Sequence, residues 1–224
     1  MTVTGLTPDA APVDPIRVLV VDDHEVLAAS LAFVLDTEPD LKVVGVAASA
    51  ASALDLAAAT APDVVLLDQR LPDGEGTALI APLHAVRSTV QVVMLTASTS
   101  DQVLLAAMEA GAAGFVDKTR SLAEVVLAVR SAAAGESLVS PRLLARLLPR
   151  LRRQETGAGN DLTAREREVL SHLSEGLSNA EIAARMTLSV HTVRNHVANL
   201  STKLGAHSKL EALSIAVRSG LISG

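Results

Sequence analysis

The sequence predicts an α/β protein of two parts, in which a doubly wound five-stranded parallel sheet precedes a small all-α domain. Short β-branched runs alternate with amphipathic stretches of helix length through the first 135 residues, and such alternation is typical of βαβ units. From Leu162 onward the apolar pattern is helical only. A stretch rich in proline, arginine and glycine separates the two patterns.

Ten elements are predicted in the first part. The strands are the apolar runs 16–21, 41–47, 64–67, 90–95 and 114–116, and the helices between them are 25–37, 50–60, 75–87, 101–110 and 121–134. Gly135 ends the last helix, and Phe33 is predicted to lie in the core. In such a sheet, ligands bind at the carboxyl ends of the strands.

The predicted organisation is a disordered leader at 1–15, a sheet domain at 16–135, a linker at 136–160 and a helical domain at 161–224. The linker is predicted to be helical up to Pro149, which would break that helix. Its arginines are either solvated or in contact with DNA phosphates. In the helical domain, capping boxes at Thr163/Glu166 and Ser178/Glu181 start two helices, and Ser189 caps a third.

Composition excludes several classes of protein. The chain has no cysteine, which rules out disulfides and thiolate chemistry. Aromatic residues make up 1%, so base stacking is nearly excluded as a means of binding single strands. The leader does not resemble a signal peptide and no apolar run is long enough to cross a bilayer, so we expect a cytoplasmic protein. The net charge is −6, yet residues 185–224 carry five basic side chains against Glu211 alone, an asymmetry that allows a DNA partner.

Polar side chains follow four of the predicted strands. Asp22 and Asp23 end the first strand, Asp68 the third, Thr96 the fourth and Lys118 the fifth. On a parallel sheet these positions meet at one edge. Clustered carboxylates repel one another, and Mg²⁺ removes that conflict. Lys118 supplies a second positive charge for a phosphoryl oxygen, and Thr96 supplies a hydroxyl donor.

Residues 16–135 therefore resemble a flavodoxin-like receiver domain of two-component signalling. The resemblance is carried by four motifs: Val-Asp-Asp-His at 21–24, Leu-Asp-Gln-Arg-Leu-Pro-Asp-Gly at 67–74, Leu-Thr-Ala at 95–97 and Gly-Phe-Val-Asp-Lys at 114–118. It implies that Asp68 accepts a phosphoryl group from a sensor histidine kinase. It also implies that Asp23, Asp68 and the main-chain carbonyl of Arg70 bind Mg²⁺, with Asp22 acting through water.

The resemblance further implies a packing switch. The acyl phosphate on Asp68 attracts the Thr96 hydroxyl, and Phe115 then swings into the vacated space. No enzyme acting on external substrates is implied, only self-catalysed phosphorylation and dephosphorylation. A phosphohydrolase using an aspartyl phosphate is a low-ranked alternative, because Arg70 stands where that class has a second aspartate.

Residues 162–222 resemble the DNA-binding domain of the NarL/FixJ, or LuxR-type, family. The resemblance is carried by 162–170, 176–183 and the stretch from Ser189 to Leu204. On the helix from Val190, Val193, Val197, Leu200 and Leu204 share one stripe and should pack inward. The opposite face suits base edges and phosphates. The predicted DNA-binding residues are His191, Thr192, Arg194, Asn195, Asn199, Lys203 and Lys209.

The sequence thus predicts a phosphorylation-controlled regulator of transcription that binds a palindromic promoter site in double-stranded DNA. Ala198 weakens the groove face, so we expect a homodimer when the chain is phosphorylated. Spare apolar residues of the last helix, Leu210 to Val217, are a candidate dimer interface. At rest the receiver either covers the recognition helix or leaves it free, and the sequence leaves both arrangements open. The runner-up is a regulator that ignores phosphate and answers to a protein partner or a ligand.

Overall fold

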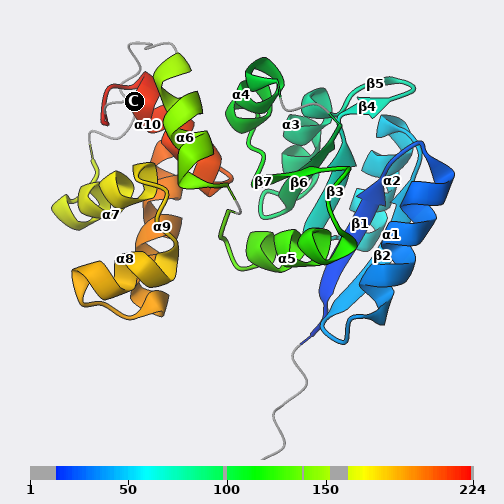
Figure 1. The fold of residues 1–224 in the computed structure, drawn as a ribbon, viewed down its shortest axis with the longest axis horizontal. Helices are drawn as coiled ribbons and strands as arrows, with labels where there is room; N and C mark the ends of the chain where they lie inside the picture. Colours follow the sequence, from blue (N-terminus) through cyan, green and yellow to red (C-terminus); the bar gives the residue numbers. More distant parts are fainter. Residues whose placement is uncertain (1–13, 98–99, 138, 152–160, 223–224) are drawn as a thin grey trace, which may run out of the picture.

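A computed structural model describes residues 14–97, 100–137, 139–151 and 161–222. Its main sheet contains five parallel strands: β1 (Ile16–Val21), β2 (Leu41–Ala47), β3 (Val64–Asp68), β6 (Gln91–Thr96) and β7 (Gly114–Asp117). They lie in the order β2-β1-β3-β6-β7 (Figure 1). The predicted five-stranded parallel sheet is confirmed, with strand ends within one residue of the prediction.

Five helices cover the two faces of this sheet: α1 (Glu25–Thr37), α2 (Ala50–Thr60), α3 (Gly76–Val86), α4 (Asp101–Glu109) and α5 (Leu122–Ala133). Buried residues of α1 and α5 pack with Val18, Val20 and Leu66 on one face. Those of α2, α3 and α4 pack with Leu19 and Val65 on the other. Neighbouring strand residues point to opposite faces, and helices cover both, so every side chain of β3 is buried.

A short hairpin follows β3, made of β4 (Arg70–Leu71) and β5 (Gly74–Glu75). It leads directly into α3, whose first residue is Gly76. The Gly76 N–H donates to the Gln69 carbonyl at 2.8 Å. The start of α3 is therefore held against the end of β3, where Asp68 lies.

The described part of the linker forms α6 (Pro141–Leu147) and a 3₁₀ turn, η1 (Leu148–Arg150). The α-helix stops close to the predicted break at Pro149. The linker is not simply solvated, because Leu144, Leu147 and Leu148 are buried. Two of its arginines contact the sheet domain, where Arg146 and Arg150 each lie 2.9 Å from a carboxylate oxygen of the same residue, Asp101.

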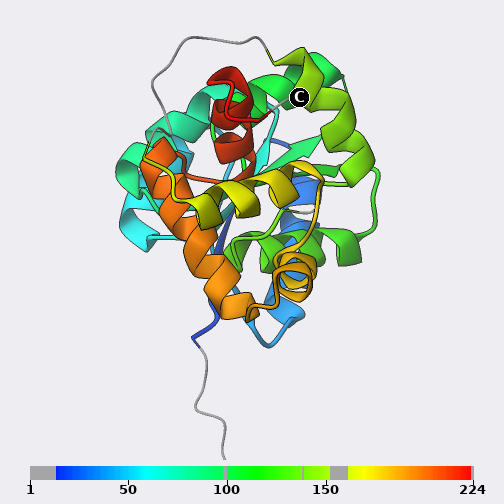
Figure 2. The same cartoon turned by 90° about the vertical axis from the view of Figure 1, so that its left-hand side faces the viewer.

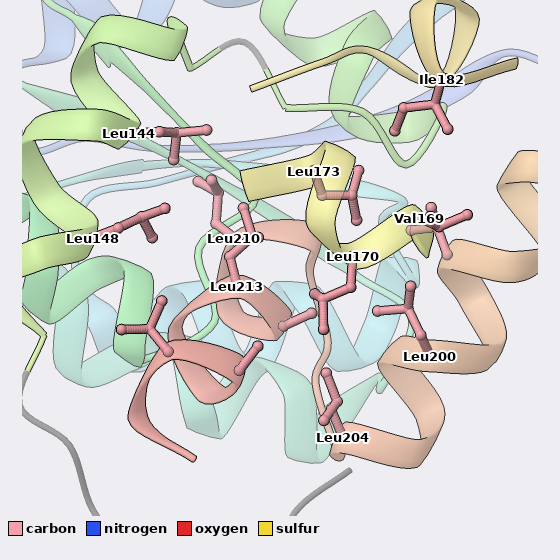
Figure 3. Packing of buried hydrophobic residues seen from close by; sticks show 14 of the residues in the cluster. Leu144, Leu148, Val169, Leu170, Leu173, Ile182, Leu200, Leu204, Leu210 and Leu213 are labelled. Carbon is pink, nitrogen blue, oxygen red and sulfur yellow. The ribbon is translucent and has the colours of Figure 1, made fainter. Parts of the chain in front are cut away.

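The helical domain contains α7 (Ala164–Ser174), α8 (Asn179–Met186), α9 (Val190–Leu204) and α10 (Lys209–Arg218). Both predicted capping boxes form, and the Ser189 side chain accepts a hydrogen bond from the Thr192 N–H. Leucines of α7, α9 and α10 pack together with those of the linker (Figure 3). The core of this domain therefore includes the linker helix.

The sheet domain and the helical domain dock against each other, and Figure 2 shows the helical domain lying across one side of the sheet domain. Met108 of α4 belongs to the same buried cluster as α10. Polar contacts reinforce this packing, since the Ser208 hydroxyl donates to the Ala112 carbonyl at 2.9 Å and Gln91 donates to the His207 carbonyl at 3.3 Å. The domains form one continuous apolar contact.

Two sequence expectations are wrong. Phe33 is 73% exposed on α1 and does not lie in the core. The apolar residues of α10 are buried inside the chain, including Leu213 and Val217, and some pack towards α4. They therefore offer no free dimer interface in this arrangement.

Most of the predicted leader lies outside the described residues. No helix of the described part is long and apolar enough to span a membrane.

Candidate phosphoryl-acceptor site and nucleic-acid interface

The structure brings the three predicted carboxylates together at the carboxyl edge of the sheet. Asp22 and Asp23 follow β1, and Asp68 ends the neighbouring strand β3. One oxygen from each lies within 4.8 Å of the others and of a ring nitrogen of His24. Asp22 and Asp68 are buried, whereas Asp23 and His24 are exposed. The cluster is thus open to solvent on one side.

His24 is a member of this cluster that sequence reasoning did not assign. Its Nδ1 lies 3.1 Å from Asp22 Oδ1 and 2.9 Å from Asp23 Oδ1. The motif at 21–24 contains this histidine, but a residue that follows a strand carries no signal for which way its ring turns. Only the fold at the start of α1 turns the ring back over both carboxylates.

Lys118 joins two of the carboxylates. Its Nζ lies 2.7 Å from Asp22 Oδ2 and 2.7 Å from Asp68 Oδ2. The main-chain N–H of Lys118 donates to the Thr96 carbonyl at 2.9 Å. Burial alone would lower the pKa of Lys118, but hydrogen bonds to Asp22 and Asp68 outweigh it and raise that pKa above its usual value. The ammonium therefore stays charged at neutral pH beside the buried Asp68 side chain.

The donor set fits a hard divalent cation. Three carboxylates face one ammonium, so the cluster has an excess of negative charge before any ion binds. Mg²⁺ is bound in proteins by one or two carboxylates, with water and phosphate oxygens completing its shell. The exposed side at Asp23 leaves room for those additional ligands.

The remaining predicted receiver residues lie around this cluster. Thr96 is buried at the end of β6, in register with Asp117 of β7. Arg70 lies two residues after Asp68 in the β4–β5 hairpin and has an exposed side chain. The switch role of Thr96 and the carbonyl role of Arg70 remain predictions.

Phe115 connects the receiver to the linker. The ring is half-buried and packs against both the receiver core and the cluster that contains α6 and the helical domain. A cavity of about 380 Å³ lies beside it, lined also by Thr96, Leu127 and Leu143. The cavity therefore provides space for movement of the Phe115 ring between the carboxyl edge of the sheet, called the acceptor edge below, and the linker helix α6.

The predicted recognition face of α9 is turned towards the receiver. Val193, Val197, Leu200 and Leu204 are buried, as their spacing predicts. His191, Arg194 and Asn195 line a groove of about 550 Å³ that is also lined by Ser88, Thr89, Gln91 and residues 133–136. Thr192 is half-buried at the helix start and Asn199 is exposed.

Two predicted DNA contacts have other partners in this arrangement. Lys203 donates to Glu166 Oε2 at 2.8 Å and to the Asp161 carbonyl at 3.2 Å. The hydrogen bond from Lys203 to Glu166 is the main reason why the pKa of Glu166 falls to about 2. The side chain of Lys209 is 8% exposed and donates to Glu136 at 3.3 Å. The partners of Lys203 lie within the helical domain itself, whereas Lys209 is held by Glu136 while the domains are docked.

Two histidines stack where the domains meet. The rings of His84, on α3, and His207, before α10, are nearly parallel with centroids 4.2 Å apart. His84 is 6% exposed, and neither of its ring nitrogens has a hydrogen-bond partner among the described residues. Burial and the neighbouring His207 lower the pKa of His84 to about 4. Glu211 is the nearby acidic side chain, 3.2 Å from His207.

Docking should weaken as the solution becomes acidic. An undocked His84 regains a pKa nearer 6.5, so the docked form binds fewer protons and its advantage is full above that pH. Between about pH 6.5 and pH 4 the docked form loses this advantage. Near pH 5.5 the docking equilibrium constant should have fallen by about tenfold from its value at high pH. Small-angle scattering across this range measures the docked fraction. His84→Phe should flatten the profile, whereas His172→Gln should not; equal profiles for all three proteins would contradict the prediction.

Comparisons with known proteins identify both domains of the chain. The model of the response regulator receiver domain matches residues 18–130, and that of bacterial regulatory proteins of the luxR family matches residues 160–216. The DNA-binding transcriptional activator DevR/DosR of Mycobacterium tuberculosis is 42% identical over 201 residues, covering 88% of this chain and 92% of its own.

Of two further matches, one covers most of the chain and the other covers the receiver alone. The transcriptional regulatory protein LiaR of Bacillus subtilis is 32% identical over 93% of this chain and 100% of its own. The solved receiver domain of the response regulator NarL of Mycobacterium tuberculosis has 36% identity and a TM-score of 0.51, covering 55% of this chain and 99% of that domain.

Proposed function

The chain belongs to the DNA-binding transcriptional response regulators that join a receiver domain to a LuxR-type domain, and from that membership we propose that Asp68 accepts a phosphoryl group from a sensor histidine kinase. The observation that carries the proposal is the position of Asp68, buried at the end of β3 with Lys118 and two further carboxylates around it. The receiver comprises residues 16–135, and the helical domain begins at about 161.

The transfer needs a carboxylate oxygen in line with the phosphorus atom. A carboxylate oxygen of Asp68 attacks the phosphorus atom. The new O–P bond forms as the P–N bond to the kinase histidine breaks, and the imidazole leaves. Lys118 offsets the charge of the phosphoryl oxygens through its ammonium. Asp23, Asp68, the Arg70 carbonyl and, through water, Asp22 would hold Mg²⁺, which when bound neutralises the same oxygens. Hydrolysis of the acyl phosphate at this site is self-catalysed.

The signal then passes from the acceptor edge to the linker. The hydroxyl of Thr96 moves towards the acyl phosphate, and the ring of Phe115 follows into the space it leaves. Support comes from the cavity beside Phe115, which Leu143 of the linker helix also lines. Movement of the ring would change the packing of the linker and with it the docking of the helical domain.

Docking is the resting state in this proposal. DNA binding requires α9 to enter a major groove about 12 Å wide, and the receiver residues that wall the groove beside His191, Arg194 and Asn195 occupy that space. Phosphorylation frees α9 by favouring the undocked form. Two freed chains then bind a palindromic site as a homodimer, because paired half-sites match the two-fold symmetry of the protein.

The proposal is tested by selecting duplex DNA with the full chain in Mg²⁺ and the phosphoryl mimic beryllofluoride. The mimic should tighten binding to the selected duplex by about 5–150-fold, which corresponds to a coupling of about 1–3 kcal/mol. Affinity should also fall steeply with salt, as phosphate contacts require. Equal affinity with and without the mimic would contradict phosphoryl control, and a flat salt dependence would contradict DNA binding.

A further inference from the structure

One carboxylate from the receiver side is held by two helix starts of the helical domain. Glu136 follows Gly135, just beyond α5. Its Oε1 accepts a hydrogen bond from the N–H of Asn179 at 3.1 Å, and its Oε2 accepts one from Lys209 Nζ at 3.3 Å. Asn179 is the first residue of α8 and Lys209 the first of α10.

The surroundings of Glu136 are built for an anion. The first N–H groups of a helix lack partners within the helix and carry partial positive charge. In α8 the Ser178 N–H is taken by Glu181, which leaves the Asn179 N–H for an outside acceptor. The side chain of Lys209 is 8% exposed, and its ammonium also donates to the Leu177 carbonyl at 3.1 Å, so a contact within the helical domain holds this charge near the start of α8.

This position lies on the same surface as the recognition face. Asn179 and Lys209 line the groove that is also lined by His191, Arg194 and Asn195. In a helix-turn-helix domain the second helix lies in the major groove while the first crosses the sugar–phosphate backbone. The start of α8 is therefore where a backbone phosphate would arrive once α9 lies in the groove.

We propose that the Asn179 N–H and the Lys209 ammonium form a binding position for a DNA phosphodiester, and that Glu136 occupies it as a competing anion in the docked chain. The inference rests on the proposed function, because it requires the helical domain to bind DNA. The receiver would then inhibit DNA binding in two ways: it covers α9 sterically, and Glu136 competes with a DNA phosphate for the same donors. Undocking replaces one internal carboxylate by one backbone phosphate at the same donors.

The test uses the full chain without phosphoryl mimic and a random-sequence duplex, whose binding reports phosphate contacts. Glu136→Gln removes the charge of the competitor and keeps its shape, so affinity should rise about fivefold. Lys209→Gln breaks the same pair but also removes the phosphate donor. Its affinity should not rise, and its plot of log affinity against log salt should be shallower by about one than that of Glu136→Gln.

Controls separate this inference from the proposed function. Glu124→Gln alters a half-exposed glutamate that pairs with Arg120 and should bind like the parent chain. If Lys209→Gln raises affinity as much as Glu136→Gln, the Glu136–Lys209 pair only stabilises the docked arrangement and the inference is wrong. If the beryllofluoride form binds DNA but Glu136→Gln matches Glu124→Gln, the inference alone fails. If no form binds duplex DNA, the proposed function fails with it.

Discussion

Asp68→Asn should abolish phosphoryl uptake by the full chain, with a fall of at least about a hundredfold, or about 2.7 kcal/mol in transition-state stabilisation. A neutral amide has no carboxylate oxygen to attack phosphorus and cannot form an acyl phosphate. The fold should survive, because asparagine has the same shape and Lys118 keeps Asp22 as a partner at 2.7 Å. Uptake is measured with radiolabelled acetyl phosphate in Mg²⁺.

The control for this substitution is Asp55→Asn, which removes an exposed carboxylate of α2 remote from the acceptor edge and should leave uptake unchanged. Asp68→Asn should also lose the response of DNA binding to beryllofluoride. If it keeps full DNA binding and regulation, phosphoryl control is wrong. A regulator controlled by a protein partner or a ligand would then be the better account.

Gly76→Ala should destabilise the receiver and misplace its acceptor. A Cβ at this position would lie 2.0 Å from the main-chain oxygen of Asp68 and 3.3 Å from the Leu67 side chain. Backbone cannot yield as a flexible side chain can, so α3 must move away from the end of β3. We expect a loss of about 3 kcal/mol in unfolding free energy, seen as a fall of about 6–12 °C in Tm.

Phosphoryl uptake should fall together with stability in Gly76→Ala, because the same displacement moves the main chain of Asp68. Gly114→Ala is the matched control, since a Cβ there meets no atom within 4 Å. A strand alanine also restricts the unfolded chain more than glycine does, so this variant should be at least as stable as the parent. Equal melting temperatures for the two variants would contradict the predicted clash.

Local patterns predicted the elements closely. Helices 25–37 and 50–60 have the predicted bounds, and the strand at β3 is one residue longer than predicted because it includes Asp68. The hydrogen bonds of a helix and the apolar periodicity of a helix or strand depend on neighbours in sequence, which a single sequence contains. The carboxylate cluster is equally predictable from the sequence, because a parallel topology places the carboxyl ends of the strands on one edge of the sheet.

Surface assignments were less reliable. Phe33 is apolar and was placed in the core, yet it lies on the outer side of α1, because one large residue does not settle which stripe of an alanine-rich helix packs inward. The charge of Lys209 predicts a DNA contact, which stays a prediction, but does not reveal that the side chain is buried against Glu136 in the docked chain. Charge predicts attraction to any anion, and the nearest anion in space lies 73 residues away in the chain.

Short spacings and the fixed geometry of a parallel sheet are enough to predict the order of the elements, their caps, and the aspartates and lysine that meet at the acceptor edge. The turn of α9 towards the receiver, the stacking of His84 on His207 and the contact of Glu136 with two helix starts become visible in the folded chain alone. These contacts join faces of separately folded units. No local pattern encodes them, since burial of each face depends on its complementarity to a distant one.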